Sequence, residues 1–176
     1  THIHADHISA LNELNKRTNC IRVMGEKSKS EVIDLRIKDG EKIKVEEVEL
    51  QAMYTPGHTD CSYSFLMNDR VFTGDTLLIN GSGRTDFQNG NAYDAYDSIF
   101  NKLLKLPEKT LVFPAHDYNG KKFSTIENEK NNNPRLQVSS KEEYADIMNN
   151  LNLANPKMMD VAVPANVKGL TLDNIN

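Results

Sequence analysis

The sequence contains only two cysteines, Cys20 and Cys61, which is far too few for a disulfide framework. Neither belongs to a Cys-x-x-Cys pair, so we interpret both as reduced, partly buried small residues rather than as metal ligands. This cysteine usage favours a reducing compartment inside the cell, and we expect a cytoplasmic protein.

The chain also has no apolar run long enough to span a bilayer and no signal-peptide pattern. Its 21 Lys and Arg are mixed with 25 Asp and Glu, so no basic surface for a nucleic acid is indicated. The charged and amide-rich residues 129–133 are interpreted as a solvated loop or helix end. We therefore expect neither a membrane nor a nucleic acid among the partners.

The sequence contains no internal repeats and no convincing linker. Its length of 176 residues, with 38% hydrophobic and 26% charged residues, is typical of one globular domain. We therefore assign residues 1–176 to a single domain. The chain begins at Thr1 inside a histidine motif, and a metal-binding loop needs a scaffold before it. We expect further sequence before Thr1.

Apolar periodicity predicts alternating strands and helices. Helices are expected at residues 8–17, 93–106, 124–130 and 141–151, and strands at residues 20–24, 43–45, 48–54, 63–67, 71–73 and 110–113. A hairpin turn is predicted at Asp39-Gly40, and the tail after residue 151 is expected to be extended and irregular. Such alternation predicts a layered α/β sandwich.

All five histidines of the chain belong to one pattern. The pattern consists of these five histidines and two aspartates: His2, His4, Asp6, His7, His58, Asp75 and His116. Each of these residues is expected to follow the C-terminal end of a strand, where short loops can hold side chains together on a rigid base. Imidazole and carboxylate are the ligands of zinc and of non-haem iron, so the pattern predicts a metal enzyme.

The number and spacing of these ligands leave two arrangements open. In the first, His2, His4 and His58 surround one metal, Asp6, His7 and His116 surround another, and Asp75 bridges the two, as in binuclear hydrolases. In the second, two histidines and one carboxylate hold a single iron and leave positions for substrate and O₂.

Several segments of the chain resemble the persulfide dioxygenases (sulfur dioxygenases) of the metallo-β-lactamase superfamily. The segments are Thr-His-Ile-His-Ala-Asp-His-Ile, Phe-Thr-Gly-Asp-Thr-Leu-Leu-Ile, Gly-Ser-Gly-Arg-Thr-Asp-Phe-Gln, Pro-Ala-His-Asp-Tyr, Asn-Pro-Arg-Leu and Val-Pro-Ala-Asn. The first is shared across the superfamily, whereas Gly-Arg-Thr-Asp-Phe-Gln and His-Asp-Tyr are more specific. The resemblance implies an αββα sandwich whose N-terminal strands are missing from this sequence.

For the site, the resemblance implies one Fe(II) per chain, held by His2, His58 and Asp75. The residues His4, Asp6, His7 and His116 would then orient these ligands and line the cavity. The implied reaction is the oxidation of glutathione persulfide, or of a related small persulfide, by O₂ to sulfite and thiol.

The resemblance also implies substrate contacts from Arg84, Tyr118 and Arg135, because an anionic substrate needs cationic or hydrogen-bonding partners. Some bacterial relatives continue into a rhodanese-like sulfurtransferase domain, so a fused or separate sulfurtransferase is an expected partner, and assembly into a homo-oligomer stays open. The cysteine that mitochondrial members carry near Gly169 is absent here.

Two rival functions are kept. A glyoxalase II-like thioester hydrolase with two zinc ions would use the same fold, but that family has His-Glu-Tyr where this chain has His116-Asp117-Tyr118. The other rival is a non-catalytic module that senses a metal or a thiol. Replacement of His58 by Ala would abolish activity in an enzyme and only alter affinity in a sensor.

Overall fold

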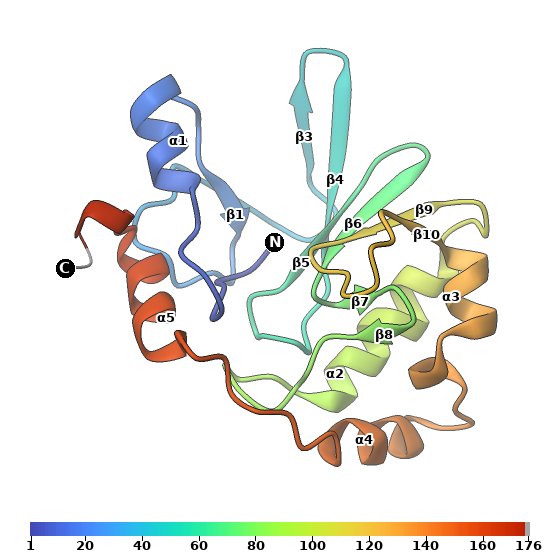
Figure 1. Ribbon diagram of the computed structural model, residues 1–176. Helices are drawn as coiled ribbons and strands as arrows, with labels where there is room; N and C mark the ends of the chain where they lie inside the picture. Colours follow the sequence, from blue (N-terminus) through green and yellow to red (C-terminus); the bar gives the residue numbers. More distant parts are fainter. Residues whose placement is uncertain (175–176) are drawn as a thin grey trace.

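The computed structural model describes residues 1–174 and contains the expected alternation of strands and helices (Figure 1). The elements are α1 (Leu11–Thr18), β1 (Val23–Gly25), β2 (Leu35–Ile37), β3 (Lys42–Val45), β4 (Val48–Tyr54), β5 (Tyr63–Leu66), β6 (Arg70–Gly74), β7 (Leu77–Leu78), β8 (Gly81–Ser82), α2 (Ala92–Tyr96), η1 (Asp97–Lys102), η2 (Leu103–Lys105), β9 (Leu111–Pro114), β10 (Ser124–Thr125), α3 (Ile126–Asn132), η3 (Pro134–Leu136), α4 (Lys141–Asn149), α5 (Met159–Lys168) and η4 (Leu172–Asn174).

A six-stranded sheet forms the centre of the molecule, with the strand order β10-β9-β6-β5-β4-β3. Its neighbours are antiparallel except β6 and β9, which run parallel with Val71 opposite Val112. The strands β4, β6 and β9 therefore all run in the same direction and end at one edge of the sheet. The residues that follow these three strands are brought together at that edge.

One face of the sheet carries the main core. Val71 and Val112 are fully buried on this face, whereas the next residue of β6, Phe72, is more than a third exposed on the other face, as period-two alternation requires. Buried apolar residues of the covering helices pack against the valines: Ala95, Ile99, Leu103, Ile126, Tyr144 and Met148. Helices α2, α3 and α4 cover this face together (Figure 1).

The predicted helix 93–106 is confirmed, but it changes its winding along its length. It begins as the α-helix α2, continues as the π-helical turn η1 and finishes as the 3₁₀ turn η2. The side chain of Asn91 caps its start by accepting hydrogen bonds from the main-chain N–H groups of Tyr93 and Asp94. The last turn ends at Lys105, and Pro107 follows after Leu106 and stops the helix, as the sequence predicts.

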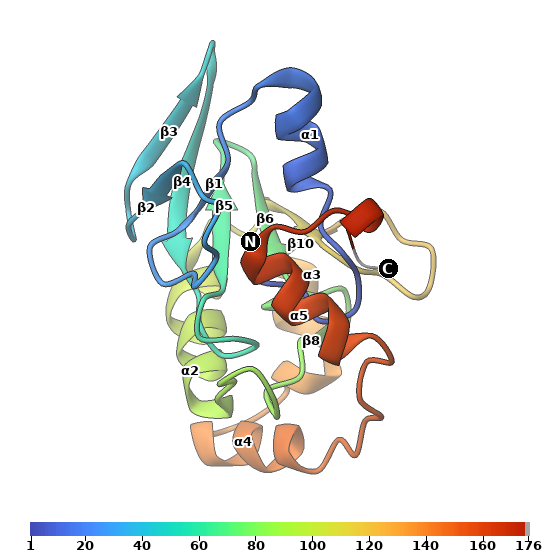
Figure 2. The same cartoon turned by 90° about the vertical axis from the view of Figure 1, so that its left-hand side faces the viewer.

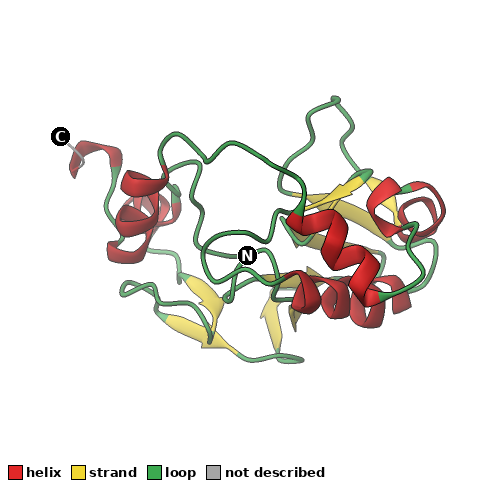
Figure 3. Ribbon diagram, turned by 90° about the horizontal axis from the view of Figure 1, so that it is seen from below, coloured by secondary structure: helices red, strands yellow, loops and turns green. Residues whose placement is uncertain are grey.

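The second part of the molecule holds the N-terminal loop, the helices α1 and α5, and a small parallel sheet of β1 and β2. Helix α5 lies beside the N-terminal segment in both side views (Figures 1 and 2). The predicted irregular tail is therefore wrong, because residues 159–168 form this helix. Figure 3 shows two groups of helices with the N-terminus between them.

The predicted hairpin turn at Asp39-Gly40 is also wrong. This turn joins β2 to β3, which belong to different sheets. The hairpin instead connects β3 to β4 through Glu46 and Glu47, with Val45 opposite Val48. Glu46 adopts a φ of 52°, the left-handed conformation that two-residue hairpin turns require.

Two further expectations are corrected by the burial of polar and sulfur-containing side chains. Glu129 and Asn133, expected to be solvated, are both completely buried. Cys61 is buried, whereas Cys20 is exposed rather than partly buried.

None of the helices within residues 1–174 combines the length and apolar character that crossing a membrane requires.

Candidate metal centre

Three of the predicted site residues follow the ends of parallel strands at one edge of the sheet. Asp75 comes directly after β6, His116 follows β9, and His58 follows β4 after Thr55-Pro56-Gly57. His2 reaches the same place from the N-terminal loop. The expectation that each metal-type residue follows a strand end is thus confirmed for His58, Asp75 and His116.

The loop that carries His58 is held against helix α2. Gly57 has a φ of 136°, and a Cβ at this position would lie 2.3 Å from the Cα of Ala95. The Ser98 hydroxyl donates a hydrogen bond to the carbonyl of Pro56 (2.6 Å). The N–H of Asn91 donates one to the carbonyl of Gly57 (2.8 Å). Glycine is required here because of both the backbone conformation and the close approach.

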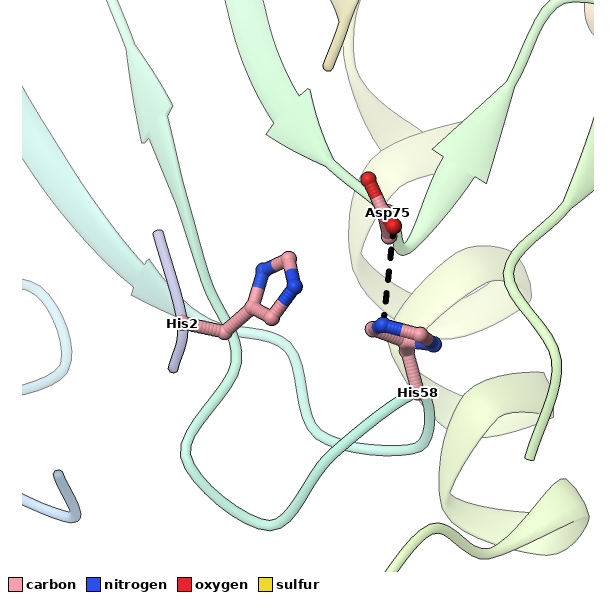
Figure 4. Close-up of side chains that lie close together, drawn as sticks. All are labelled: His2, His58 and Asp75. Atoms are coloured by element: carbon pink, nitrogen blue, oxygen red, sulfur yellow. Dashed lines mark ion pairs between the residues drawn. The ribbon is translucent and has the colours of Figure 1, made fainter. Parts of the chain in front are cut away.

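His2, His58 and Asp75 form one cluster (Figure 4). Each offers a ligand atom, and the three atoms all lie within 4.8 Å of one another. The Nε2 atom of His58 lies 3.5 Å from Oδ2 of Asp75, and the rings of His2 and His58 meet edge to face at 4.8 Å. With small side-chain adjustments, all three atoms can lie roughly 2.1 Å from one shared metal ion, the distance at which imidazole and carboxylate bind a transition metal.

The charge states in this cluster suit a bound cation. Burial, with the neighbouring His4 and His58, holds the pKa of His2 well below its usual range, so the ring is neutral and can act as a ligand. Burial raises the pKa of Asp75, and His58 and His116 oppose that shift. The Oδ1 atom of Asp75 is buried and has no hydrogen-bond partner in the described part of the chain. A buried, unsatisfied carboxylate oxygen beside two imidazoles fits a metal ion.

His4, Asp6 and His7 form a second and more exposed cluster. Nδ1 of His7 lies 3.1 Å from Oδ1 of Asp6. The two-metal arrangement predicted from the sequence grouped His4 with His2 and His58. In the structure the ligand atom of His4 clusters with those of Asp6 and His7. The ring of His4 also lies 4.2 Å from the ring of His2.

His116 lies between the two clusters. Its Nε2 atom is 3.6 Å from Oδ2 of Asp6 and 3.6 Å from Oδ2 of Asp75. All seven predicted site residues therefore come together at one edge of the sheet.

A cavity of about 470 Å³ opens beside Asp75. Predicted site residues in its lining are Asp6, His58, Asp75, Arg84, His116, Tyr118 and Arg135. The apolar residues of its wall are Ala5, Leu78, Phe87, Leu153, Ala154 and Pro156. This size and mixture of an apolar wall with few polar groups are typical of a small-molecule site.

The two arginines of the cavity differ in what they bind. The guanidinium of Arg84 donates two hydrogen bonds of 2.6 Å to the carboxylate of Asp86, and it also binds the carbonyls of Ala154 (2.6 Å) and Leu153 (3.1 Å). Arg135 donates to the carbonyl of Ser82, and no carboxylate within residues 1–174 pairs with it. Burial lowers the pKa of Arg135.

Tyr118 lies at the rim of the cavity. Its side chain is 85% exposed, and its ring is parallel to that of His116 at 6.1 Å. Its hydroxyl is thus available to a molecule that enters the cavity.

Several residues that shape the site were not identified from the sequence. Phe87 meets the ring of His58 edge to face at 6.0 Å and lies under the Arg84 guanidinium at 4.7 Å. Leu153, Ala154 and Pro156 form a wall, and the Asn166 amide donates to the main-chain carbonyls of His4 and His7. Phe87 and Asn166 belong to segments that carry the family resemblance, but their roles depend on contacts with distant parts of the chain.

Comparisons with known proteins identify the family of this chain. The sequence pattern of the metallo-beta-lactamase superfamily matches residues 24–116. The mitochondrial persulfide dioxygenase ETHE1 of Homo sapiens is 45% identical over 171 residues, which are 96% of this chain and 66% of the human protein. The crystal structure of ETHE1 from Myxococcus xanthus superposes with a TM-score of 0.92 and 49% identity, over 94% of this chain and 73% of that one.

A hydroxyacylglutathione hydrolase of Dictyostelium discoideum is more distant, at 32% identity over 75% of this chain and 53% of its own length. Of the human persulfide dioxygenase, the chain spans 66% of the length, a little less than two thirds.

Proposed function

This chain belongs to the metallo-β-lactamase superfamily and, within it, to the ETHE1 persulfide dioxygenase family, and we propose from this membership that it is an iron-dependent persulfide dioxygenase. The proposed reaction converts glutathione persulfide, O₂ and water into glutathione, sulfite and two protons. The protein would require one Fe(II) per chain.

The observation that carries the proposal is the cluster of His2, His58 and Asp75, of which His58 and Asp75 line the cavity. Two histidines and one carboxylate on one side of a metal are typical of non-haem Fe(II) oxygenases. When bound, Fe(II) would supply open positions and redox chemistry for O₂ and for the persulfide sulfur.

The surrounding residues hold these three side chains ready. Nδ1 of His58 lies 2.8 Å from the carbonyl of Arg84, so the ring presents Nε2 to Asp75. His116 reaches both Asp75 and Asp6 through Nε2 and is in place to hydrogen-bond a substrate atom beside Asp75.

For the substrate, the guanidinium of Arg135, which pairs with no carboxylate within residues 1–174, is the best candidate to bind a carboxylate of glutathione. Phe87, Leu153 and Pro156 would exclude water from the thiol end, and Tyr118 would hydrogen-bond the peptide part at the rim. Arg84 has its donors engaged by Asp86 and by two carbonyls, and its proposed role in substrate binding is to hold the wall of the cavity.

The test uses full-length protein loaded with Fe(II) under anaerobic conditions. Addition of glutathione persulfide and O₂ should give O₂ consumption with release of one sulfite per O₂. Metal analysis should give one iron per chain. A protein that keeps stoichiometric iron and produces no sulfite would contradict the proposal.

A second candidate, thioester hydrolysis with two zinc ions, is favoured by one observation. The cluster of His4, Asp6 and His7 lies beside the first, with His116 between them, so a second metal could be held. Two zinc ions per chain together with hydrolysis of S-lactoylglutathione would support this candidate in place of the dioxygenase.

A further inference from the structure

The side chain of Asn166 binds three main-chain groups of the histidine loop, which we define as residues 1–9. Its Nδ2 group donates to the carbonyls of His4 and His7, both at 2.9 Å, and its Oδ1 accepts from the N–H of Ser9 at 2.8 Å. Asn166 lies on α5, near the other end of the chain. One amide group therefore ties the end of the chain to its beginning.

The histidine loop has no strand or helix of its own and depends on such contacts. Besides Asn166, the carbonyl of Thr1 accepts a hydrogen bond from the N–H of Tyr63 (3.0 Å), and that of Ile3 accepts from Nε2 of Gln88 (3.0 Å). These contacts hold the first part of the loop. Asn166 supplies the contacts of the second part, through His4, His7 and Ser9.

Helix α5 is itself anchored to the body of the protein, so that Asn166 is held in a defined place. The carbonyl of Val167 accepts a hydrogen bond from the N–H of Glu31 (2.8 Å), and Nδ2 of Asn12 donates to the carbonyl of Gly169. Ala162 and Ala165 are buried, and their small side chains allow a close approach. Pro164 lacks an N–H group and so removes one hydrogen bond from the interior of α5, which makes this docking more important for its stability.

We propose that Asn166 is a positioning residue of the metal centre. It fixes the main chain at His4 and His7. The ring of His4 lies 4.2 Å from that of His2, and through this contact Asn166 supports the place of His2. The side chain of Asn166 does not reach the cluster of His2, His58 and Asp75; it acts through the carbonyls of residues 4 and 7. This inference rests on the proposed function insofar as His2 is taken as a metal ligand. It goes beyond that function by giving the C-terminal helix a share in metal binding.

The experiment measures binding of Co(II), a probe that needs neither persulfide nor O₂, to metal-free full-length protein by calorimetry and by its visible absorption spectrum. Asn166→Ala should weaken the Co(II) Kd by about 10- to 100-fold, the usual cost of losing a group that orients a metal ligand. Asn166→Asp keeps the acceptor for Ser9 but loses both donors, so it should weaken the Kd at least as much. Asn149→Ala, an exposed asparagine of α4, is the control and should bind like the unmodified protein.

An Asn166→Ala protein that folds and binds Co(II) with unchanged Kd and spectrum would overturn the inference. Amide hydrogen exchange of the unmodified protein decides the matter if both variants fail to fold. Co(II) should then slow exchange at the Ser9 N–H and along α5 but not along α4, because coupling between two sites is reciprocal. Unchanged exchange in α5 on Co(II) binding would also overturn it. Absence of dioxygenase activity in the iron-loaded protein would contradict the proposed function and leave this result untouched.

Discussion

The main-chain carbonyl of Arg84 lies 2.8 Å from Nδ1 of His58. A carbonyl can only accept a hydrogen bond, so Nδ1 of His58 carries the proton and Nε2 is left free toward Asp75. The orientation of a candidate metal ligand is thus set by the backbone of the Gly81-Ser82-Gly83-Arg84 segment. This segment lies directly behind the metal centre.

The first prediction concerns Gly83, where the backbone passes closest to the site. A Cβ at this position would lie 2.0 Å from the carbonyl oxygen of Asp75 and 3.0 Å from Nδ1 of His58. Gly83→Ala must therefore move its own segment, or the main chain of Asp75 and the ring of His58. We expect the Kd for Fe(II) or Co(II) to rise at least about tenfold and the protein to lose about 1–3 kcal/mol of unfolding free energy. Metal titration and chemical denaturation measure the two effects.

Gly81→Ala is the matched control, because it adds the same methyl group two residues earlier. A Cβ at Gly81 would meet only the Cβ of Leu78 at 3.9 Å, an ordinary contact distance. This variant should bind metal like the unmodified protein. Equal metal affinities of the two variants would argue against a role of the segment in orienting His58.

The second prediction separates the two arginines of the cavity. Loss of the Arg84 guanidinium in Arg84→Ala frees the carbonyls of Leu153 and Ala154. We expect faster amide exchange in residues 152–157 and a KM for the persulfide raised about tenfold, the equivalent of about 1.4 kcal/mol. Arg135→Ala should raise KM for glutathione persulfide but not for an uncharged alkyl persulfide, and it should leave exchange in residues 152–157 unchanged. Unaltered exchange in Arg84→Ala would show that Arg84 does not hold this wall.

The strand-end residues His58, Asp75 and His116 could be predicted from the sequence because their positions follow from local patterns. Each comes after a short apolar run, and parallel strands end at a common edge. The contacts of Arg84 with residues 153–154 and of Asn166 with the histidine loop join segments 69 to 162 residues apart in the chain. No local pattern encodes which carbonyl a given amide or guanidinium will meet.

Burial of polar side chains was the least predictable feature. Residues 129–133 contain only charged and amide side chains, which is typical of a solvated helix end. In the structure one stripe of this helix faces the core, and Glu129 and Asn133 lie four residues apart on it. They bind each other, and the remaining partners include the N–H of Asn80 and the carbonyl of Gly81, which lie 49 and 52 residues away in the chain. Similarly, α5 contains Pro164, which speaks against a helix, and tertiary docking overrides this local preference.

The third prediction follows from the buried carboxylate of Glu129. It accepts hydrogen bonds from the hydroxyl of Ser124 (2.5 Å), the N–H of Asn80 (2.8 Å) and the amide of Asn133 (2.8 Å). Glu129→Ala removes the acceptor of the buried Ser124 hydroxyl and one of the acceptors of the buried Asn133 amide, and it leaves a cavity, so we expect a loss of about 3 kcal/mol or more of unfolding free energy. Lys130→Ala on the exposed side of the same helix should change stability by less than about 0.5 kcal/mol. Comparable losses in both variants, measured by urea denaturation, would contradict this account.

The fourth prediction concerns the pH dependence of the metal-free protein. Burial, with the neighbouring His7, lowers the pKa of His4 to about 4, against about 6.5 in an unfolded chain. Between these values the unfolded state binds more protons than the folded state, so stability falls as the pH falls from about 6.5 toward about 4. At about pH 5 the His4 ring accounts for a loss of about 1–2 kcal/mol.

His4→Asn cannot take up this proton, so its melting temperature should fall less than that of the unmodified protein between about pH 7.5 and about pH 5. The difference between the two proteins isolates His4 from His2, whose lowered pKa acts in the same direction, and from Asp75, whose raised pKa acts in the opposite one. Thermal unfolding in the presence of a chelator measures it. An equal fall in both proteins would mean that the His4 ring is as accessible to protons in the folded state as in the unfolded chain.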